Sequence, residues 1–562
     1  MRQVIGWVLA GLGMVTWAHG AEEKPSPADP AIAAIIGTLP VPAFDLVPAS
    51  APLAVTTSSE LAQKHVSAGI SLIHGGWDFE AYRHFCAALR EDPDCLMAYW
   101  GISLALTQQD PEYGGQQAAA FERMLALAQA GVGTELERGY AFCLALVFSA
   151  GPAAAADSFQ KLAEKFPNET QARLFAAILG RGGYDEFGMP KPDQLQAERN
   201  LRQMLEAKPD DSLLLFAFLS IHAEAADLLD TLELARKLAS LKADFPPYQH
   251  LLGHYEFRCG NHALAVQAFR LAVDGFSTAS KTSGVSIFDC PNLIKSRLYL
   301  ATALEAAGAG DEALTMAREL AAIKIDAART YSSGASLLLW EGETLPARLL
   351  LGRTSKGTAG LALAAMPPVA EIKAIKRPPV AIIFYQALAI YLEGRVAIDA
   401  GKLDRAAQLA EALDQTHARL AAAGELASGQ NSRSYWIRAV KAMAAHTTEL
   451  RGLLAMAGPV AGRGSAFNWY RSAIDKESRA TLMMPPLTTY PMALRLGDYH
   501  ASRIGPVASE LERAQAAYQD GLNAQPNHLR TLRAMEAAFH AAKQPQQAAE
   551  LARRIKQVEG QK

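Results

Sequence analysis

The feature that most constrains this chain is an internal repeat of 34 residues with small and large side chains at fixed offsets. Counted from residue 62, positions 8, 20, 24, 27 and 32 of the first copy are Gly69, Ala81, Phe85, Ala88 and Pro93. Small residues at positions 8 and 20 let two helices cross closely, and the large residue at 24 with the small one at 27 fits the next copy. Proline at 32 ends the second helix because it cannot continue the hydrogen-bond ladder. The pattern therefore predicts helix pairs stacked in series.

Further copies with the same spacing follow along the chain. The clearest one, counted from residue 246, carries Gly253, Ala265, Phe269 and Ala272, and others close at Pro167, Pro209 and Pro526. No convincing strand pattern of alternating polar and apolar residues occurs from residue 61 onward. The spacing is interrupted at 110–118 and 274–292, which we interpret as inserts that argue against one uniform superhelix.

Together these units resemble tetratricopeptide repeats (TPRs), over roughly 62–350 and 380–556. The resemblance implies an all-α fold, an α-solenoid of TPR-like helix pairs, possibly in two blocks, with a continuous groove that binds peptides or partner proteins. More narrowly, the stretches 92–101 and 485–497 are similar to a group of secreted bacterial repeat proteins. That second resemblance implies no enzymatic activity.

The N-terminus has the layout of a secretory signal peptide. Residues 1–20 combine a basic start, an apolar run from Val4 to Trp17 and small residues at Ala18 and Gly20. The apolar run is too short to span a bilayer. We therefore expect cleavage near Gly20, a periplasmic or secreted protein, and no transmembrane segment in the mature chain.

Proline-rich stretches suggest the remaining boundaries. Residues 21–60 are dense in proline, which predicts an extended arm or linker. Two Pro-Pro pairs predict a linker at 366–379, since each pair stops a helix. The predicted organisation is then a solenoid block over 61–365 and a C-terminal TPR-like block over 380–562.

Composition and motifs exclude several classes of protein. The chain carries 54 Lys+Arg against 57 Asp+Glu, and a formal charge of −3 gives no reason to expect nucleic acid as a partner. Five cysteines in 562 residues exclude a disulfide scaffold. The sequence contains no nucleophile elbow, phosphate loop or zinc-protease motif. We therefore expect neither enzymatic activity nor a cofactor.

Positions 5 and 9 of the first helix in each unit are expected to face the groove of a TPR-like solenoid. The predicted contact residues at these positions include Trp100, Tyr140, Tyr391 and Arg395. Aromatic and arginine side chains make good anchors for a partner. The alternative is that these rings pack on the neighbouring repeat or on an insert. The first unit has Val66 and Ile70 where repeats that clamp a peptide carboxylate carry Lys and Asn, so we expect no binding of that type.

His250 and His254 form the most specific candidate polar site in the sequence. They lie four residues apart and share one helix face, which Arg258 continues. Two imidazoles at this spacing can bind Zn²⁺ or Cu²⁺ if a third ligand arrives, and Glu224 or His222 is a candidate. The alternative is a polar patch of hydrogen-bonded histidines without metal.

The sequence thus predicts an exported scaffold or adaptor that binds other proteins or peptides through its concave groove. The first alternative is a periplasmic small-molecule or metal-binding protein with a site around His250 and His254. The second is an enzyme accessory, or an enzyme, that uses the pocket between the two blocks.

Overall fold

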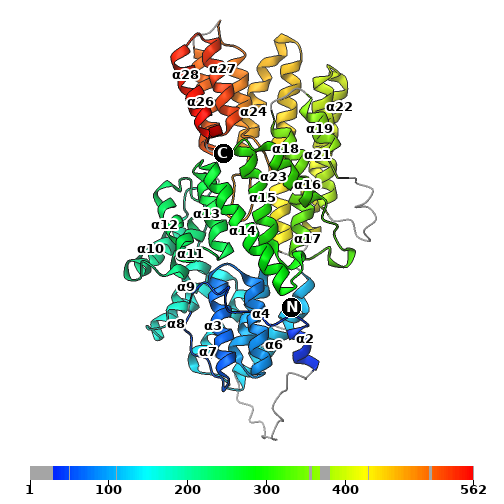
Figure 1. Cartoon of the computed structure of the whole chain (residues 1–562). Helices are drawn as coiled ribbons and strands as arrows, with labels where there is room; N and C mark the ends of the chain where they lie inside the picture. Colours follow the sequence, from blue (N-terminus) through cyan, green and yellow to red (C-terminus); the bar gives the residue numbers. More distant parts are fainter. Residues whose placement is uncertain are drawn as a thin grey trace. The chain divides into compact units, whose positions relative to one another are not determined.

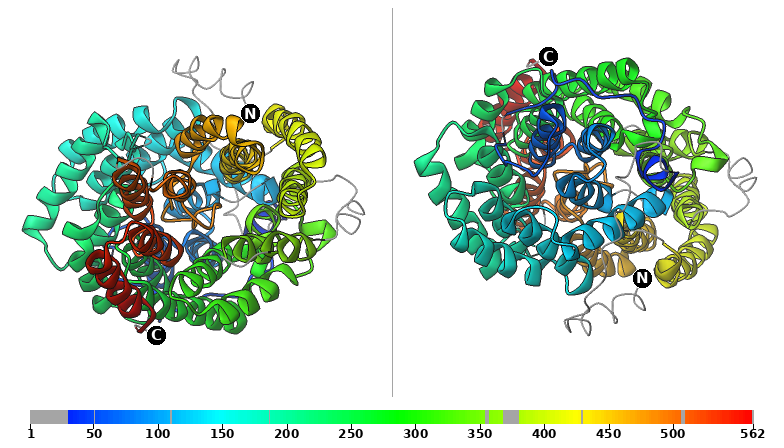
Figure 2. Two further views of the ribbon diagram at one scale, coloured as in Figure 1. Left: turned by 90° about the horizontal axis from the view of Figure 1, so that it is seen from above. Right: turned by 90° about the horizontal axis from the view of Figure 1, so that it is seen from below.

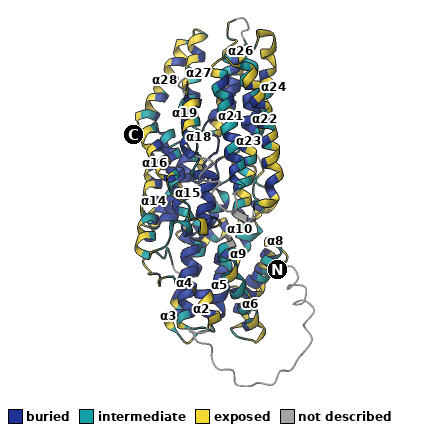
Figure 3. Cartoon of the chain, turned by 90° about the vertical axis from the view of Figure 1, so that its right-hand side faces the viewer, coloured by how far each residue is buried: buried dark blue, intermediate teal, exposed yellow. Residues whose placement is uncertain are grey.

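The computed structural model describes residues 30–49, 51–108, 111–185, 187–353, 357–367, 380–427, 430–505 and 509–560. Within these ranges the regular elements are helices (Figure 1), and extended backbone pairs at two isolated bridges, Tyr184 with Pro190 and Thr481 with Met484. Buried residues gather on the faces where helices meet, and exposed residues lie on their outer faces (Figure 3). The predicted all-α class is confirmed.

The chain divides into two compact units. The first holds residues up to 107 and 113–222, and the second holds 108–112 and the residues from 223 onward. The first unit is built from α2 (Pro30–Ile36), α3 (Glu60–His74), α4 (Asp78–Glu91), α5 (Leu96–Ala105), α6 (Gly114–Gln129), α7 (Glu135–Ser149), α8 (Pro152–Lys165), α9 (Thr170–Gly180), α10 (Pro192–Ala207) and α11 (Ser212–His222). From α3 onward each helix packs against the next.

The second unit repeats this arrangement. Its helices are α12 (Leu229–Leu241), α13 (Pro246–Arg258), α14 (His262–Ser283), α15 (Pro291–Ala306), α16 (Gly310–Ala321), α17 (Ser333–Leu337), α18 (Leu345–Gly352), α19 (Thr358–Ala364), α21 (Ala381–Asp399), α22 (Leu403–Ala422), α23 (Gln430–Ala457), α24 (Ala466–Lys476), α25 (Ala493–Ala501), α26 (Ser509–Ala524), α27 (Leu529–Ala541) and α28 (Pro545–Gly560). Helices α12 to α16 and α21 to α28 each pack against their successor. Both units are therefore solenoids of TPR-like helix pairs.

The marker positions of the repeat make the contacts that their sizes predict. A Cβ on Gly69 would lie 2.6 Å from the Phe85 ring, and one on Gly253 would lie 2.7 Å from the Phe269 ring. Real Cβ atoms do not approach a ring so closely. Glycine at position 8 is therefore what lets the two helices of a pair cross at this distance. Ala81, at position 20, is fully buried at the same kind of crossing.

Proline also sets where the second helix of a pair ends. Helix α4 stops at Glu91, just before Pro93. The unit counted from residue 246 has Ser277 at the proline position, and α14 accordingly continues to Ser283. There Gly284 adopts the left-handed conformation with φ of 64° and ends the helix. The first part of the predicted insert at 274–292 is thus an extension of α14.

The described part of the proline-rich arm docks on the first unit. Helix α2 buries Ile32 and Ile35, and the Tyr82 hydroxyl donates a hydrogen bond to the Ile35 carbonyl at 3.0 Å. The Arg83 guanidinium donates to the Pro40 carbonyl at 3.1 Å. The predicted signal peptide at 1–20 lies outside the described residues.

The boundary predicted at 366–379 lies largely outside the described residues. Helices α19 and α21, on its two sides, contact each other within the second unit, and the two compact units divide after His222. The position of the boundary between the predicted blocks stays a prediction.

Two further sequence expectations concern cysteine and membranes. All five cysteines are free thiols. Among the described helices, α21 alone is long and apolar enough to cross a membrane by length and composition, and 56% of its most apolar window is buried in the structure.

Candidate functional site

The inner face of the second unit is occupied by the chain itself. Residues 477–492, which we call the inner segment, join α24 to α25 without forming a helix. They are drawn in orange in Figure 2, where they lie on the inner side of the green and yellow helices. Pro485, Pro486 and Pro491 favour an extended course, since proline lacks a backbone N–H and restricts the residue before it. Leu487 is buried, so the inner segment forms part of the core of this unit.

Polar side chains from α13, α15 and the loop between α11 and α12 bind the backbone of the first half of the inner segment. The Glu224 carboxylate accepts the Leu482 N–H at 2.9 Å, and His250 Nε2 donates to the Leu482 carbonyl at 2.9 Å. The Tyr299 hydroxyl, from α15, lies 3.0 Å from the Met484 carbonyl. Groups that could have faced a ligand are therefore engaged by the inner segment.

Two arginines bind the backbone of the second half of the inner segment. Arg438, on α23, donates to the Pro485 carbonyl at 2.5 Å, and Arg348, on α18, donates to the Leu487 carbonyl at 3.4 Å. The Thr489 hydroxyl returns a hydrogen bond of 2.8 Å to the Arg348 carbonyl. The segment is thus tied to helices that lie far apart in sequence.

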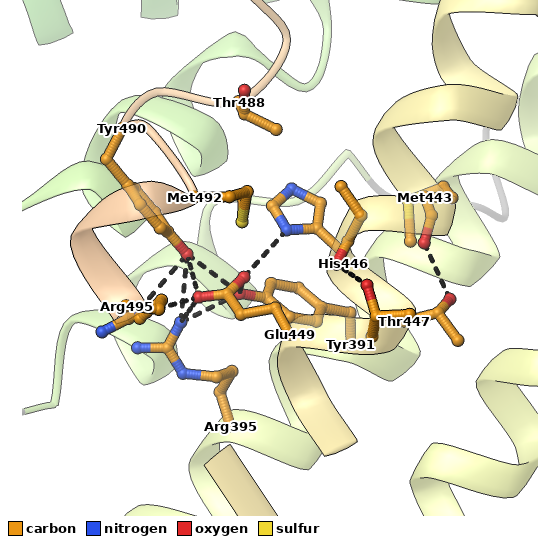
Figure 4. Close-up of polar contacts among 12 residues, drawn as sticks. Tyr391, Arg395, Met443, His446, Thr447, Glu449, Thr488, Tyr490, Met492 and Arg495 are labelled. Carbon is orange, nitrogen blue, oxygen red and sulfur yellow. Dashed lines mark hydrogen bonds and ion pairs between the residues drawn. The ribbon is translucent and has the colours of Figure 1, made fainter. Parts of the chain in front are cut away.

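A buried polar cluster fixes the end of the inner segment (Figure 4). At its centre is Glu449 of α23, which is fully buried. Its carboxylate accepts hydrogen bonds of 2.7 Å each from the Tyr391 hydroxyl, the Tyr490 hydroxyl and Arg495 Nε. His446 Nδ1 lies 3.2 Å from Oε2 of this carboxylate, the oxygen that also accepts the hydrogen bond from Tyr391. We call these residues, with Arg395, the Glu449 cluster.

The charges in the Glu449 cluster keep its carboxylate ionised. Burial by itself would raise the pKa of Glu449, but Arg495, the hydrogen bond from His446 and Arg395 at 3.8 Å outweigh it and hold the pKa well below its usual range. Donors surround both carboxylate oxygens. The arrangement therefore anchors Tyr490, and with it the inner segment, to α21 and α23.

This geometry corrects the expectation of an open groove in the second unit. His250, Tyr391 and Arg395 do lie on the inner faces of their helices, as the repeat spacing predicts. They contact the inner segment or the Glu449 cluster, however, and His250 and Tyr391 are buried. The physical reason is that the chain fills this face with its own residues.

His254 and Arg258 are also engaged within the fold. His254 is fully buried, with Nε2 donating to the Ala223 carbonyl at 3.1 Å and Nδ1 3.0 Å from the Tyr299 hydroxyl. Arg258 donates to the carbonyls of Ala223 and Ala225 at 3.2 and 2.7 Å. These contacts hold the loop that follows α11 against α13.

The alternative of a metal or small-molecule site at these two histidines finds no support. The remaining ring nitrogen of His250, Nδ1, lies 2.9 Å from the Ser296 hydroxyl, so both nitrogens of both rings have partners. Burial lowers the pKa of His250 to about 4, and the ring is neutral near pH 7. Glu224, a candidate third ligand, is bound to Leu482. The described ranges contain no group of three or more side chains suited to hold a metal ion.

The two aromatic residues predicted at the groove of the first unit form part of its core. Trp100 and Tyr140 are fully buried, and Trp100 Nε1 donates to the Tyr140 carbonyl at 3.1 Å. The two rings meet edge to face at 5.4 Å, and Phe175 meets Trp100 in the same way at 5.5 Å. The alternative interpretation, packing on a neighbouring repeat, is the one that the structure supports.

The sequence analysis missed the Glu449 cluster. A weak signal was present, because Glu449 is the one carboxylate among residues 442–456 of a helix. Its partners come from two other parts of the chain, Tyr391 on α21 and Tyr490 with Arg495 around the start of α25, and no repeat spacing brings these parts together.

Glu477, at the start of the inner segment, predicts a pH-dependent stability. Burial raises its pKa to about 7, although it accepts hydrogen bonds from the Met492 N–H at 2.9 Å and the Thr488 hydroxyl at 3.3 Å. Between its ordinary pKa of 4.5 and about 7 the folded state holds more protons than the unfolded state. Stability therefore falls as pH rises through this window.

Between pH 5 and pH 8 the free energy of unfolding of the wild type should fall by about 2–3 kcal/mol more than that of Glu477→Gln. Urea unfolding at both pH values measures this difference. Equal losses in the two proteins would contradict the raised pKa of Glu477.

A second, open surface lies at the C-terminal end of the second unit. Side chains of α24, α25 and α26 line a groove of about 690 Å³, which we call the C-terminal groove. Phe467 is 38% exposed there and lies 6.1 Å from the Tyr499 ring, and the guanidinium of Arg503 stacks over Tyr499 at 5.3 Å. Unlike the inner face, this surface offers aromatic and arginine side chains to solvent.

The charges of the C-terminal groove are asymmetric. Glu510 is buried and pairs with Arg503 at 3.5 Å and Arg513 at 3.3 Å, so its negative charge lies beneath the two guanidinium groups. Arg471 on α24 adds a third exposed arginine, and Asp520 is the exposed acid of the lining. The accessible surface therefore carries an excess of positive charge.

The stacked helix pairs, with glycine at position 8 against the ring at position 24, define a TPR-like helical-repeat protein. No protein-family model matches the sequence, and no curated protein matches it.

Solved structures of low similarity were found. The human IFIT1 dimer with m7Gppp-AAAA is 12% identical, with 89% of this chain and 91% of that chain covered and a TM-score of 0.28. The TPR domain of P58(IPK) is 13% identical, with 86% and 99% covered and a TM-score of 0.20. Yeast Tom70 is 11% identical, with 88% and 92% covered and a TM-score of 0.26. Scores this low carry no argument about function, and the fold stands on the packing of the chain itself.

Proposed function

We propose that this chain is an exported helical-repeat protein of the secreted bacterial type that serves as a scaffold or adaptor for protein partners. The observation that carries the proposal is the lining of the C-terminal groove, where Phe467 and three arginines reach solvent above the buried Tyr499 ring. Aromatic and arginine side chains supply most of the binding energy at protein interfaces. The proposal assigns the chain no catalytic activity, no cofactor and no nucleic acid.

The C-terminal groove also indicates the chemistry of the partner. Arg471, Arg503 and Arg513 would face acidic residues across an interface, which steers association and fixes orientation. Phe467 would receive an apolar side chain. A peptide segment with acidic residues around one apolar anchor fits both features.

The test is photo-crosslinking in the native cell from a reactive residue placed at position 467. We expect a discrete covalent adduct with one protein, identified by mass spectrometry. The adduct should be lost in an Arg471→Glu background and kept with Arg405→Glu, which reverses an exposed charge on α22 outside the groove. An adduct that both backgrounds keep, or no adduct at all, would argue against docking in the C-terminal groove.

Export is tested separately, by fractionation and by sequencing the N-terminus of the mature protein. A periplasmic or extracellular protein that begins near Ala21 is the expected result. A cytoplasmic protein that retains Met1 would overturn this part of the proposal.

A further inference from the structure

A second cavity lies deeper in the second unit, away from the C-terminal groove. Its volume is about 350 Å³, within the range of small-molecule sites. Helices α15, α18 and α27 and the inner segment contribute its walls. Three arginines line it, Arg353, Arg530 and Arg533, together with the hydroxyls of Thr488 and Thr489.

Two of these arginines have acidic partners. Arg353 lies 3.3 Å from the Glu305 carboxylate, and Arg533 lies 2.5 Å from the Glu559 carboxylate. Both acids line the same cavity. These pairs are close to neutral, so they contribute hydrogen-bonding groups and little net charge.

Arg530 is different. Among the described residues, no carboxylate is ion-paired with it, and its guanidinium donates only to the Gly352 carbonyl at 3.3 Å while stacking over the Tyr490 ring at 4.8 Å. Burial and the repulsion of nearby Arg495 lower the pKa of Arg530, and the attraction of Tyr490 and Asp498 offsets this only in part. A partly buried guanidinium without an ion-paired acid favours an anionic partner.

The surroundings of Arg530 also favour a negatively charged ligand. Residues 528–530 begin α27 at the cavity wall, and the N-terminal end of a helix carries a partial positive charge. Through Tyr490, Arg530 also adjoins the Glu449 cluster, where Arg395 and Arg495 both pair with Glu449 and Arg495 lies 4.0 Å from Asp498. The local excess of positive charge therefore extends beyond the cavity wall.

We propose that this cavity is a binding site for a small organic anion, a carboxylate or a phosphate monoester, held by Arg530. The threonine hydroxyls and the arginine–glutamate pairs would bind hydroxyl groups on the same molecule. The proposal goes beyond the scaffold role and uses none of the residues of the C-terminal groove. It also differs in place from the histidine site that the sequence suggested.

The test is isothermal titration of the full chain with gluconate and with glycerol 3-phosphate, using glucose and glycerol as neutral matches. We expect one of the two anions to bind at one site and to raise the melting temperature, while its neutral match does neither. Binding of gluconate assigns a carboxylate ligand, and binding of glycerol 3-phosphate assigns a phosphate ligand.

Variants connect the binding to the cavity. Arg530→Gln should weaken binding at least tenfold, whereas Arg405→Gln, an exposed position on α22, should leave it unchanged. If Arg530→Gln does not fold, Arg533→Gln replaces it, since the Arg533 side chain is 50% exposed and its loss leaves the core intact. The proposal is overturned if neither anion binds, or if the folded cavity variant binds as tightly as the wild type.

Discussion

Replacing Glu449 by alanine should destabilise the second unit by about 3–5 kcal/mol, the range for removing one partner of a buried ion pair. The carboxylate is fully buried, and its removal leaves Arg395 without its acid and Arg495 with Asp498 alone, at 4.0 Å. The Tyr391 and Tyr490 hydroxyls lose their acceptor as well. Urea unfolding followed by circular dichroism measures the loss.

Glu411→Ala is the matched control for this prediction. Glu411 also pairs with an arginine of α23, Arg451, at 3.3 Å, but its side chain is 66% exposed. Exposed pairs of this kind contribute about 0–1 kcal/mol. If the two substitutions cost the same, the Glu449 cluster is not the buried network described here.

Trp100→Ala should destabilise the first unit by about 3–5 kcal/mol, the usual cost of emptying the site of a large buried aromatic side chain. Trp100 is fully buried, its indole N–H is bonded to the Tyr140 carbonyl, and two aromatic rings pack against its edge and face. The loss should appear as a lower melting temperature of this unit. A groove residue would instead affect partner binding and leave stability unchanged.

Phe142→Ala on the adjacent helix α7 is the control. Phe142 is 58% exposed, so its removal should change stability by no more than about 0.5 kcal/mol. A Trp100→Ala variant that melts like the wild type would place Trp100 at the surface and restore the interpretation as a groove residue.

The fold could be predicted from the sequence because its determinants are local. Gly69 and Phe85 lie sixteen positions apart within one helix pair, and their contact is set by the geometry of that pair alone. Proline likewise acts locally on where a helix ends. Helix α4 ends before Pro93, and α14, which lacks a proline at the same repeat position, is longer.

The candidate site could be predicted only in part. The repeat spacing predicts inner helix faces for His250 and Tyr391 from local geometry, and in the structure His250 contacts Leu482 of the inner segment and Tyr391 contacts Glu449. What occupies those faces depends on contacts such as Leu482 with Glu224, which are separated by more than two hundred residues. No repeat period encodes such a contact. The occupied inner face, the Glu449 cluster and the cavity beside Arg530 therefore emerged only from the three-dimensional arrangement.

The chain fills the inner face of its second unit with residues 477–492. Hydrogen–deuterium exchange of the full chain measures whether these residues are held there. The segment has no helix, yet the Leu482 amide is bonded to the half-buried Glu224 and the Met492 amide to Glu477. We expect peptides covering 478–492 to exchange as slowly as those of α24 and α25, and Glu224→Ala to speed exchange at Leu482. Exchange across the wild-type segment as fast as in an unstructured peptide would contradict the claim and leave the inner face free for a partner.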